Sequence, residues 1–182
     1  MTIATAKAAM MAASADAQPE QYTETETYSR NILGPVWFEL SKLSVRGTAG
    51  LPTPPDFVAP DQSAYIVAED EKFVASLNIK FNKSPLSSLL MCLGSTVTVN
   101  FHFEGQGRKA TELDLSASIV TVKDQYEYIV TLSGIPNEEG MTPGLYEVSA
   151  TVEVGPAEHK CSQFVLGYGY ISEVLLQVYP AL

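Results

Sequence analysis

The stretch from Gly144 to Gly155 constrains the fold of this chain more than any other. Apolar side chains occupy every second position, with Glu, Ser or Thr between them; the apolar set is Tyr146, Val148, Ala150, Val152 and Val154. Successive side chains of an extended strand point to opposite faces, so this spacing predicts a strand with one buried and one hydrated face. The buried face needs other apolar surfaces to cover it.

The same alternation recurs along the chain, interrupted by short polar segments or segments that contain Gly and Pro. We predict strands at residues 36–45, 73–81, 96–104, 113–119, 126–132 and 168–179, with shorter pieces at 65–68 and 161–166. The apolar parity slips near Ser41 or Lys42, which predicts a bulge of the kind that lets a first strand change sheets. Gly167 and Gly169 predict a kink or a bulge in the last strand.

One short helix is expected between the second and third of these long strands. Ser84 and Pro85 are typical of a helix start, and Gly94 is typical of a helix end. The leucines at positions 86, 89, 90 and 93 fit about two helical turns. We expect this helix to close one end of the molecule.

These elements predict an all-β protein. Parallel strands need long crossover connections, which this pattern lacks, so the sheets are expected to be antiparallel. Seven to eight strands, each with one buried face, indicate two sheets packed face to face or a barrel, and we favour the antiparallel β-sandwich.

The start of the 144–155 strand resembles a feature of immunoglobulin-like sandwiches. Pro143, Gly144 and Tyr146 are similar to the Pro-Gly-x-Tyr start of the penultimate strand in those folds. Residues 126–133 and 145–154 also resemble their last long hairpin. The resemblance implies an immunoglobulin-like sandwich in which Tyr146 ties its strand to the preceding turn. The Cys-Trp-Cys spacing of antibody domains is absent.

The first residues of the chain show no sustained apolar period. We predict a disordered N-terminal tail at residues 1–30 and one β-sandwich domain at residues 31–182. Lys7, the apolar residues 8–13 and the small residues Ala15 and Ala17 have the order of a secretory signal. Because the apolar segment is short and made mostly of Ala, a cytoplasmic protein is expected and export is the alternative.

Composition excludes several classes of function. A hydrophobic fraction of 46% is enough for a core, and a net charge of −10 disfavours nucleic acid and anionic membrane surfaces as partners. No apolar run has the length of a membrane-spanning helix, so no membrane insertion is expected. The two cysteines, Cys92 and Cys161, are few for a small secreted domain, and whether they pair depends on the compartment.

The residues needed for catalysis are sparse, and no catalytic residue is predicted. His102 and Glu104 share the wet face of one strand, but a solvated strand face explains them better than an acid–base pair. No Gly-x-Ser-x-Gly elbow or phosphate-binding loop is present. The protein is therefore expected not to be an enzyme.

No metal site or cofactor is predicted either. His159, Cys161, Cys92 and His102 do not have a standard zinc spacing. The loop acids lack the Asp-x-Asp-x-Asp spacing of calcium loops, so we assign them to surface solubility; they are Asp61, Glu69, Asp70, Glu71, Glu138 and Glu139.

The last strand carries the best interaction signal. Tyr168 and Tyr170 share one parity, and flat aromatic surfaces of this kind stack on sugar rings or pack within a strand layer. Ile171, Leu175 and Tyr179 have the opposite parity, so the strand is partly apolar on both faces. Such a strand should be covered by the tail, by the Pro-rich loop or by a second chain.

These observations favour a non-catalytic interaction or assembly protein that self-associates through a protein surface. The candidate interaction residues are Tyr168, Tyr170, Ile171, Leu175 and Tyr179. The alternative is a secreted carbohydrate-binding or adhesion-type module that uses the C-terminal tyrosines.

Overall fold

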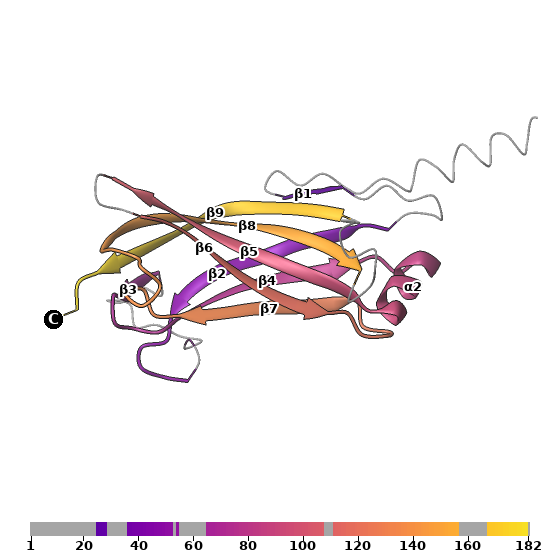
Figure 1. Ribbon diagram of the computed structural model, residues 1–182, viewed down its shortest axis with the longest axis horizontal. Helices are drawn as coiled ribbons and strands as arrows, with labels where there is room; N and C mark the ends of the chain where they lie inside the picture. The colour runs from indigo at the N-terminus through magenta and orange to yellow at the C-terminus, as the bar shows by residue number, and fades with distance from the viewer. Residues whose placement is uncertain are drawn as a thin grey trace, which may run out of the picture.

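The protein is all-β, as the alternation predicted. The computed structural model describes residues 25–28, 36–52, 54, 65–107, 111–156 and 167–181. Its strands are β1 (Thr25–Tyr28), β2 (Phe38–Gly47), β3 (Ile66–Ala68), β4 (Phe73–Phe81), β5 (Ser95–Gln106), β6 (Glu112–Val120), β7 (Glu127–Gly134), β8 (Gly144–Pro156) and β9 (Gly167–Tyr179). A short helix, α2 (Pro85–Leu93), lies at one end of the strands (Figure 1).

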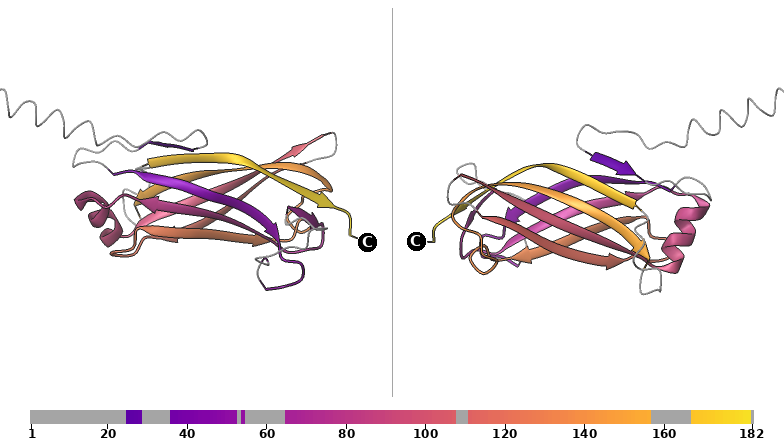
Figure 2. Two further views of the ribbon diagram at one scale, coloured as in Figure 1. Left: turned by 180° about the vertical axis from the view of Figure 1, so that it is seen from behind. Right: turned by 45° about the horizontal axis from the view of Figure 1, so that its top comes forward.

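The strands form two sheets around one core. The larger sheet has the order β1-β9-β8-β5-β6, with β3 also paired to β9, and the smaller has the order β2-β4-β7. The larger sheet is strongly twisted and curls over the smaller one (Figure 1, Figure 2). Both inner faces contribute to the core, whose largest fully buried side chains include Phe38, Phe73, Phe101, Phe103 and Tyr146.

The predicted faces are confirmed in the central strands. Every apolar residue of the 144–155 pattern is buried in β8, which lies between β5 and β9. In β5, Val97, Val99, Phe101 and Phe103 are buried. This strand continues to Gln106, two residues beyond the predicted end at residue 104.

Two predictions about strand pairing are wrong. The pairing is not antiparallel throughout, because β3 runs parallel to β9, with Ile66 opposite Gln177. The long connection that parallel pairing requires is supplied by the part of the chain that contains β4 to β8. Residues 126–133 and 145–154 do not form a hairpin, because β7 pairs with β4 whereas β8 pairs with β5 and β9. The connection at 135–143 carries the chain from one sheet to the other.

The bulge predicted in the first long strand is confirmed. The register of β2 against β4 shifts between Ser41 and Ser44, and Lys42 adopts a positive φ of 55°. The strand does not change sheets, because β2 pairs with β4 on both sides of the bulge. The extra residue instead brings Val45 into the core beside Phe38 and Leu40.

The predicted hydrogen bonding of Tyr146 is also confirmed. Its hydroxyl donates to the carbonyl oxygen of Thr142 at 2.6 Å and accepts from the Thr142 N–H at 2.9 Å. The phenol thereby satisfies both backbone groups of Thr142 just before β8 begins.

The ends of α2 lie where the sequence predicted them. The Ser84 hydroxyl accepts from the Ser87 N–H at 3.1 Å, Pro85 opens the helix, and Gly94 ends it with a left-handed φ of 78°. The buried face is formed by Ser87 and Met91, however, and not by the leucine row. Ser87 donates to the Asn82 side chain at 2.7 Å, which orients the helix so that its leucines at 89 and 93 are exposed.

Candidate functional site

The predicted interaction strand β9 lies inside the larger sheet and is not an edge. β8 pairs with one side of it, and β1 and β3 pair with successive parts of the other side. Thr25–Tyr28, which form β1, belong to the segment that the sequence assigned to the tail. The backbone of β9 is therefore paired within the chain along much of its length, which leaves its side chains to make contacts.

A register shift in β9 decides which of its side chains face outward. Val148 lies opposite Val174, but Ala150 lies opposite Ile171, so β9 has one extra residue between these pairs. The exposed fractions are 55% for Tyr168, 47% for Tyr170, 54% for Leu175 and 38% for Tyr179. These four residues have two different sequence parities and still share the outer face. We call them the outer β9 patch.

The fifth predicted interaction residue points the other way. Ile171 is only 7% exposed and belongs to the core. The bulge predicted in the last strand is present, but it lies between Ile171 and Val174 and not at Gly167 and Gly169. Glycine is favoured at position 169 for a different reason, because a Cβ there would lie 2.7 Å from Phe38 Cε2 and 2.8 Å from Leu40 Cδ1.

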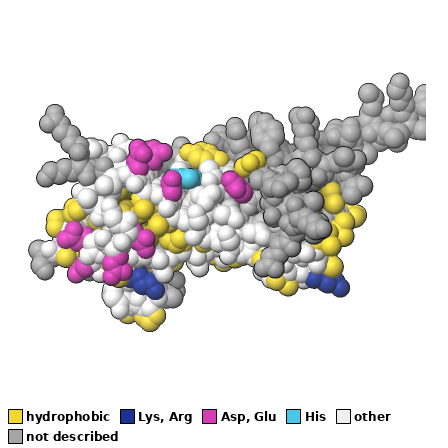
Figure 3. Space-filling model, in the orientation of Figure 1, with side chains coloured by type: hydrophobic (Ala, Val, Ile, Leu, Met, Phe, Trp, Pro, Cys, Tyr) yellow, Lys and Arg dark blue, Asp and Glu magenta, His cyan; other side chains and the backbone are white. Residues whose placement is uncertain are grey.

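A row of polar cross-strand contacts borders the outer β9 patch. His102 lies between Asp114 and Thr151, with its Nδ1 2.7 Å from Asp114 Oδ1 and its Nε2 2.9 Å from Thr151 Oγ1. The partner of His102 is thus Asp114 on the neighbouring strand and not Glu104, which the sequence had placed beside it. The register places Thr151 opposite Tyr170, so this row reaches the patch. Asp and Glu side chains are prominent on the surface shown in Figure 3.

Asp114, His102 and Thr151 are connected in the order of an orienting acid, a base and a nucleophile. Acyl transfer also needs N–H donors aimed at a developing oxyanion. Thr151 lies opposite Asn100 on one side and Tyr170 on the other, in the middle of a sheet whose N–H groups bond to neighbouring strands. These contacts therefore form a polar tie between β6, β5 and β8.

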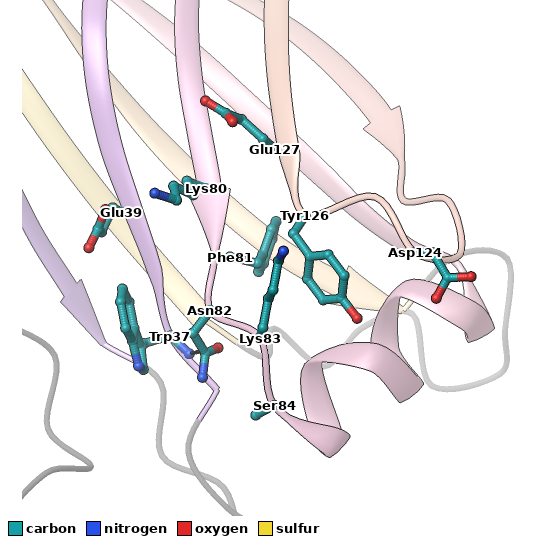
Figure 4. Close-up of a pocket in the computed structure, with 10 residues that line it drawn as sticks. All are labelled: Trp37, Glu39, Lys80, Phe81, Asn82, Lys83, Ser84, Asp124, Tyr126 and Glu127. Atoms are coloured by element: carbon teal, nitrogen blue, oxygen red, sulfur yellow. Dashed lines mark hydrogen bonds between the residues drawn. The ribbon is translucent and has the colours of Figure 1, made fainter.

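A cleft of about 760 Å³ lies on the opposite sheet, beside the start of α2 (Figure 4). A cross-strand row of alternating charge crosses β2, β4 and β7, because Glu39 lies opposite Lys80 and Lys80 lies opposite Glu127. Figure 4 shows Trp37 and Tyr126 on opposite sides of the cleft, with Lys83 between them. The Lys83 ammonium lies 5.7 Å from the Tyr126 ring centroid.

The cleft owes its shape to hydrogen bonds at the end of β4. The side-chain oxygen of Asn82 accepts from the backbone N–H of Trp37 at 3.1 Å and from the Ser87 hydroxyl at 2.7 Å. The hydroxyls of Tyr126 and Ser88 are 2.7 Å apart. These bonds hold β2, β7 and α2 around the cleft, where aromatic and charged groups suit a small polar ligand.

Sequence reasoning missed this cleft. Trp37 and Tyr126 fall inside the predicted strands 36–45 and 126–132, so the alternation did not mark them as site residues. The polar break Asn82-Lys83-Ser84, between a strand and a helix, was the available signal. The charge row was not visible, because it depends on the register of three strands that are separated in the sequence.

The predicted loop acids are partly structural. Glu71 accepts hydrogen bonds from the N–H groups of Ala49 at 2.6 Å and Ala68 at 3.2 Å, and Glu69 accepts from Ala181 at 3.1 Å. These carboxylates satisfy backbone donors at the end where β3 and β9 meet, a role beyond surface solubility.

The remaining ligand candidates do not gather in the described part of the chain. Cys92 is an exposed free thiol, while His159, Cys161 and Asp61 lie outside the described residues. Among the described residues, no group of three or more His, Cys, Asp or Glu side chains is placed to hold a metal ion. Within the same residues, no helix has the length and apolar character needed to cross a membrane.

Comparisons with known proteins identify no family. No family model and no curated protein matches the chain. Two crystal structures of a beta-glucosidase from Listeria innocua, one in complex with glucose, align with TM-scores of 0.36 at 11% and 13% identity. Each alignment covers 91% of this chain but only 17% and 18% of the beta-glucosidase chains. A similarity this weak does not support a shared function.

Proposed function

We propose that this protein is a non-catalytic interaction and assembly module with an immunoglobulin-like sandwich fold. In this proposal the chain self-associates and uses the outer β9 patch to bind a protein partner. The observation that carries the proposal is the exposure of three tyrosines and a leucine on one face of a strand whose backbone is largely paired.

The composition of the patch supports a contact through side chains. Tyr is enriched at protein interfaces, where a large apolar ring with one polar atom gives contact area at a small entropic cost. The adjoining strand contributes Glu147, Thr151 and Glu153, which lie opposite Leu175, Tyr170 and Tyr168. A centre of aromatic and aliphatic groups beside polar groups is typical of a specific protein interface.

The proposed immunoglobulin-like topology is supported by the two sheets around one core and by the Tyr146–Thr142 hydrogen bonds. A cytoplasmic location is part of the same proposal. N-terminal sequencing of the mature chain tests that location, because cleavage after Ala17 would indicate export.

Two measurements test the interaction role. Sedimentation velocity over a range of concentrations should show a mass that rises with concentration, whereas a strict monomer would remove self-association. Partner capture is compared between the wild type, a Tyr168→Ser/Tyr170→Ser variant and an Ile129→Ser control. Ile129 is 70% exposed on the other sheet, so its loss should leave the captured set unchanged. The same captured set for the tyrosine variant would refute the role of the patch.

Carbohydrate binding is the second candidate function. It is favoured by Tyr168 and Tyr170, which are exposed two residues apart next to hydrogen-bonding groups on β8. A glycan-binding screen followed by calorimetric titration tests it. Loss of binding in Tyr168→Ser/Tyr170→Ser would place the sugar on the patch, and loss in Trp37→Ser would place it in the cleft. No binding to any glycan would remove this candidate.

A further inference from the structure

The strand β6 forms an edge of the larger sheet. Its nine residues pair with β5 without interruption, from Thr96 opposite Val120 to Glu104 opposite Glu112. In the part of the chain that the structure describes, no strand pairs with its other side. An edge of this kind presents unpaired N–H and C=O groups, which are a template for another strand.

The inner face of β6 is incompletely covered. Leu113, Leu115, Ala117 and Ile119 point toward the core but are only half-buried. Their direct partners on β5, such as Phe101 opposite Leu115, are fully buried. A strand added beside β6 would remove more of this apolar surface from water, and the gain grows with the area buried.

Among the usual protections of an edge strand, β6 has two charged side chains near one end, Glu112 and Asp114. Its sequence, ELDLSASIV, contains no Lys, Pro or Gly, and its register against β5 has no bulge. By contrast, β2 carries a bulge with Lys42 at a positive φ. β6 is therefore a regular edge that is open to pairing.

We propose that β6 of a second copy of this chain pairs with β6 of the first. The two strands are antiparallel and are related by a two-fold axis at Ser116. The larger sheets of the two copies then form one continuous sheet. This proposal rests on the proposed self-association but gives it a surface distinct from the outer β9 patch, which stays available for another partner.

Both the charges and the two faces of β6 suit this arrangement. On the outer face, antiparallel pairing about Ser116 sets Glu112 opposite Val120 and Asp114 opposite Ser118 of the second copy. On the inner face, it sets Leu113 opposite Ile119 and Leu115 opposite Ala117. A parallel pairing of the same edge would need a two-fold axis along the strands, which would turn the apolar inner face of one copy onto the outer side of the joint sheet.

The other regular edge, β7, is less suited to this role. Its inner residues Tyr128 and Val130 are already buried, so an added strand would cover little further apolar surface on that face. If β6 of one copy paired with β7 of the next, the contact would be heterologous and would propagate into open chains. A two-fold β6–β6 contact stops at the dimer.

Two lysine substitutions on the same face test the register. Ser116→Lys places two ammonium groups opposite each other at the axis, so the dimer dissociation constant should rise about threefold. Ser118→Lys places each ammonium opposite Asp114 of the second copy, so the constant should fall about threefold or more. Both serines are exposed and bonded to β5 side chains, which makes the two variants a matched pair.

The general charge effect runs in the same direction for both variants. Each added lysine reduces the repulsion between copies of net charge −10, so weaker association in Ser116→Lys cannot come from net charge. Circular dichroism and the unfolding midpoint confirm that each variant is folded. In the wild type, amide hydrogen exchange should slow in β6 as concentration rises, with no matching change in β7.

The outcomes separate this proposal from the proposed function. A wild type that stays monomeric at every concentration overturns self-association itself. A wild type that associates while both lysine variants shift the same way, or neither shifts, overturns only the β6 register. A mass that grows past the dimer identifies open β6–β7 pairing and also overturns the two-fold contact.

Discussion

The two sides of this molecule close differently. On one side, β2 of the smaller sheet packs against β9 of the larger one, and Gly169 lets Phe38 and Leu40 approach its backbone. On the other side, β6 and β7 are joined by residues 121–126 but pair with different strands. The first side is sealed by side chains that reach the opposite backbone, and the second leaves the inner face of β6 half-exposed.

The same sequence pattern underlies both sides. β5 and β6 have equally regular alternation, yet the apolar residues of β5 are buried and those of β6 are half-buried. The difference arises because β5 lies over the smaller sheet between two neighbours, whereas β6 is an outer strand. Alternation therefore shows which face points inward but not how completely that face is covered.

The largest expected effect contrasts core truncations on the two sides. Phe38→Ala should lower the free energy of unfolding by about 3–5 kcal/mol, because it leaves a cavity in a fully packed region. Leu115→Ala should cost about 1 kcal/mol, because its half-buried side chain loses less contact. Chemical denaturation measures both, and equal costs would contradict the contrast between the closed and open sides.

The next effect tests the close approach at Gly169. Gly169→Ala should lower the free energy of unfolding by about 1–3 kcal/mol, since its methyl group would overlap Phe38 and Leu40. Gln177→Ala, an exposed position on the same strand, serves as the control and should change stability little. An unchanged free energy of unfolding in Gly169→Ala would show that β2 can move away from β9 at no cost.

The connection between the two open edges depends on Tyr128. Its hydroxyl accepts from the Val122 N–H at 2.9 Å and donates to the Gln125 carbonyl at 2.7 Å. Tyr128→Phe should cost about 1–2 kcal/mol, because backbone groups of the turn lose their partner. Hydrogen exchange at residues 121–126 should quicken, whereas Tyr170→Phe, an exposed control, should have no such effect. Unchanged exchange would mean that the turn holds without the phenol.

The same residue predicts an alkaline loss of stability. Burial raises the pKa of Tyr128 above its ordinary value of 10.0. The folded state therefore holds the proton more tightly than the unfolded state, and this contribution is complete below pH 10. It falls as pH rises through the higher pKa of the folded state. Denaturation at several alkaline pH values should show a smaller decline for Tyr128→Phe than for the wild type.

The smallest effect concerns β2, the edge strand that carries the bulge at Lys42. Lys42 has a left-handed φ of 55°, which costs a side-chain-bearing residue more than glycine. Lys42→Gly should raise the free energy of unfolding by about 0.5 kcal/mol. Lys80→Gly, in the regular strand β4, should lower it by a similar amount. A destabilised Lys42→Gly variant would show that the lysine side chain contributes more than its backbone costs.

The candidate sites were predictable to different degrees. The outer β9 patch contains four of the five residues chosen from the sequence, because exposed aromatic residues in a strand are a local signal. Ile171 was misplaced because a single extra residue in β9 reverses the parity after it. The Trp37 cleft and the His102–Asp114 contact were missed, because both need the register of strands that are distant in the sequence.

The amino-acid sequence by itself determined the strands, their inward faces, the bulge near Lys42 and the ends of α2. These features depend on the backbone geometry and hydrogen bonds of a few neighbouring residues. Only the tertiary structure decided that β3 runs parallel to β9, that β7 and β8 belong to different sheets, and that β6 has a neighbour on only one side among the described strands. Pairing and coverage are set by packing between segments far apart in the chain, which local periodicity does not encode.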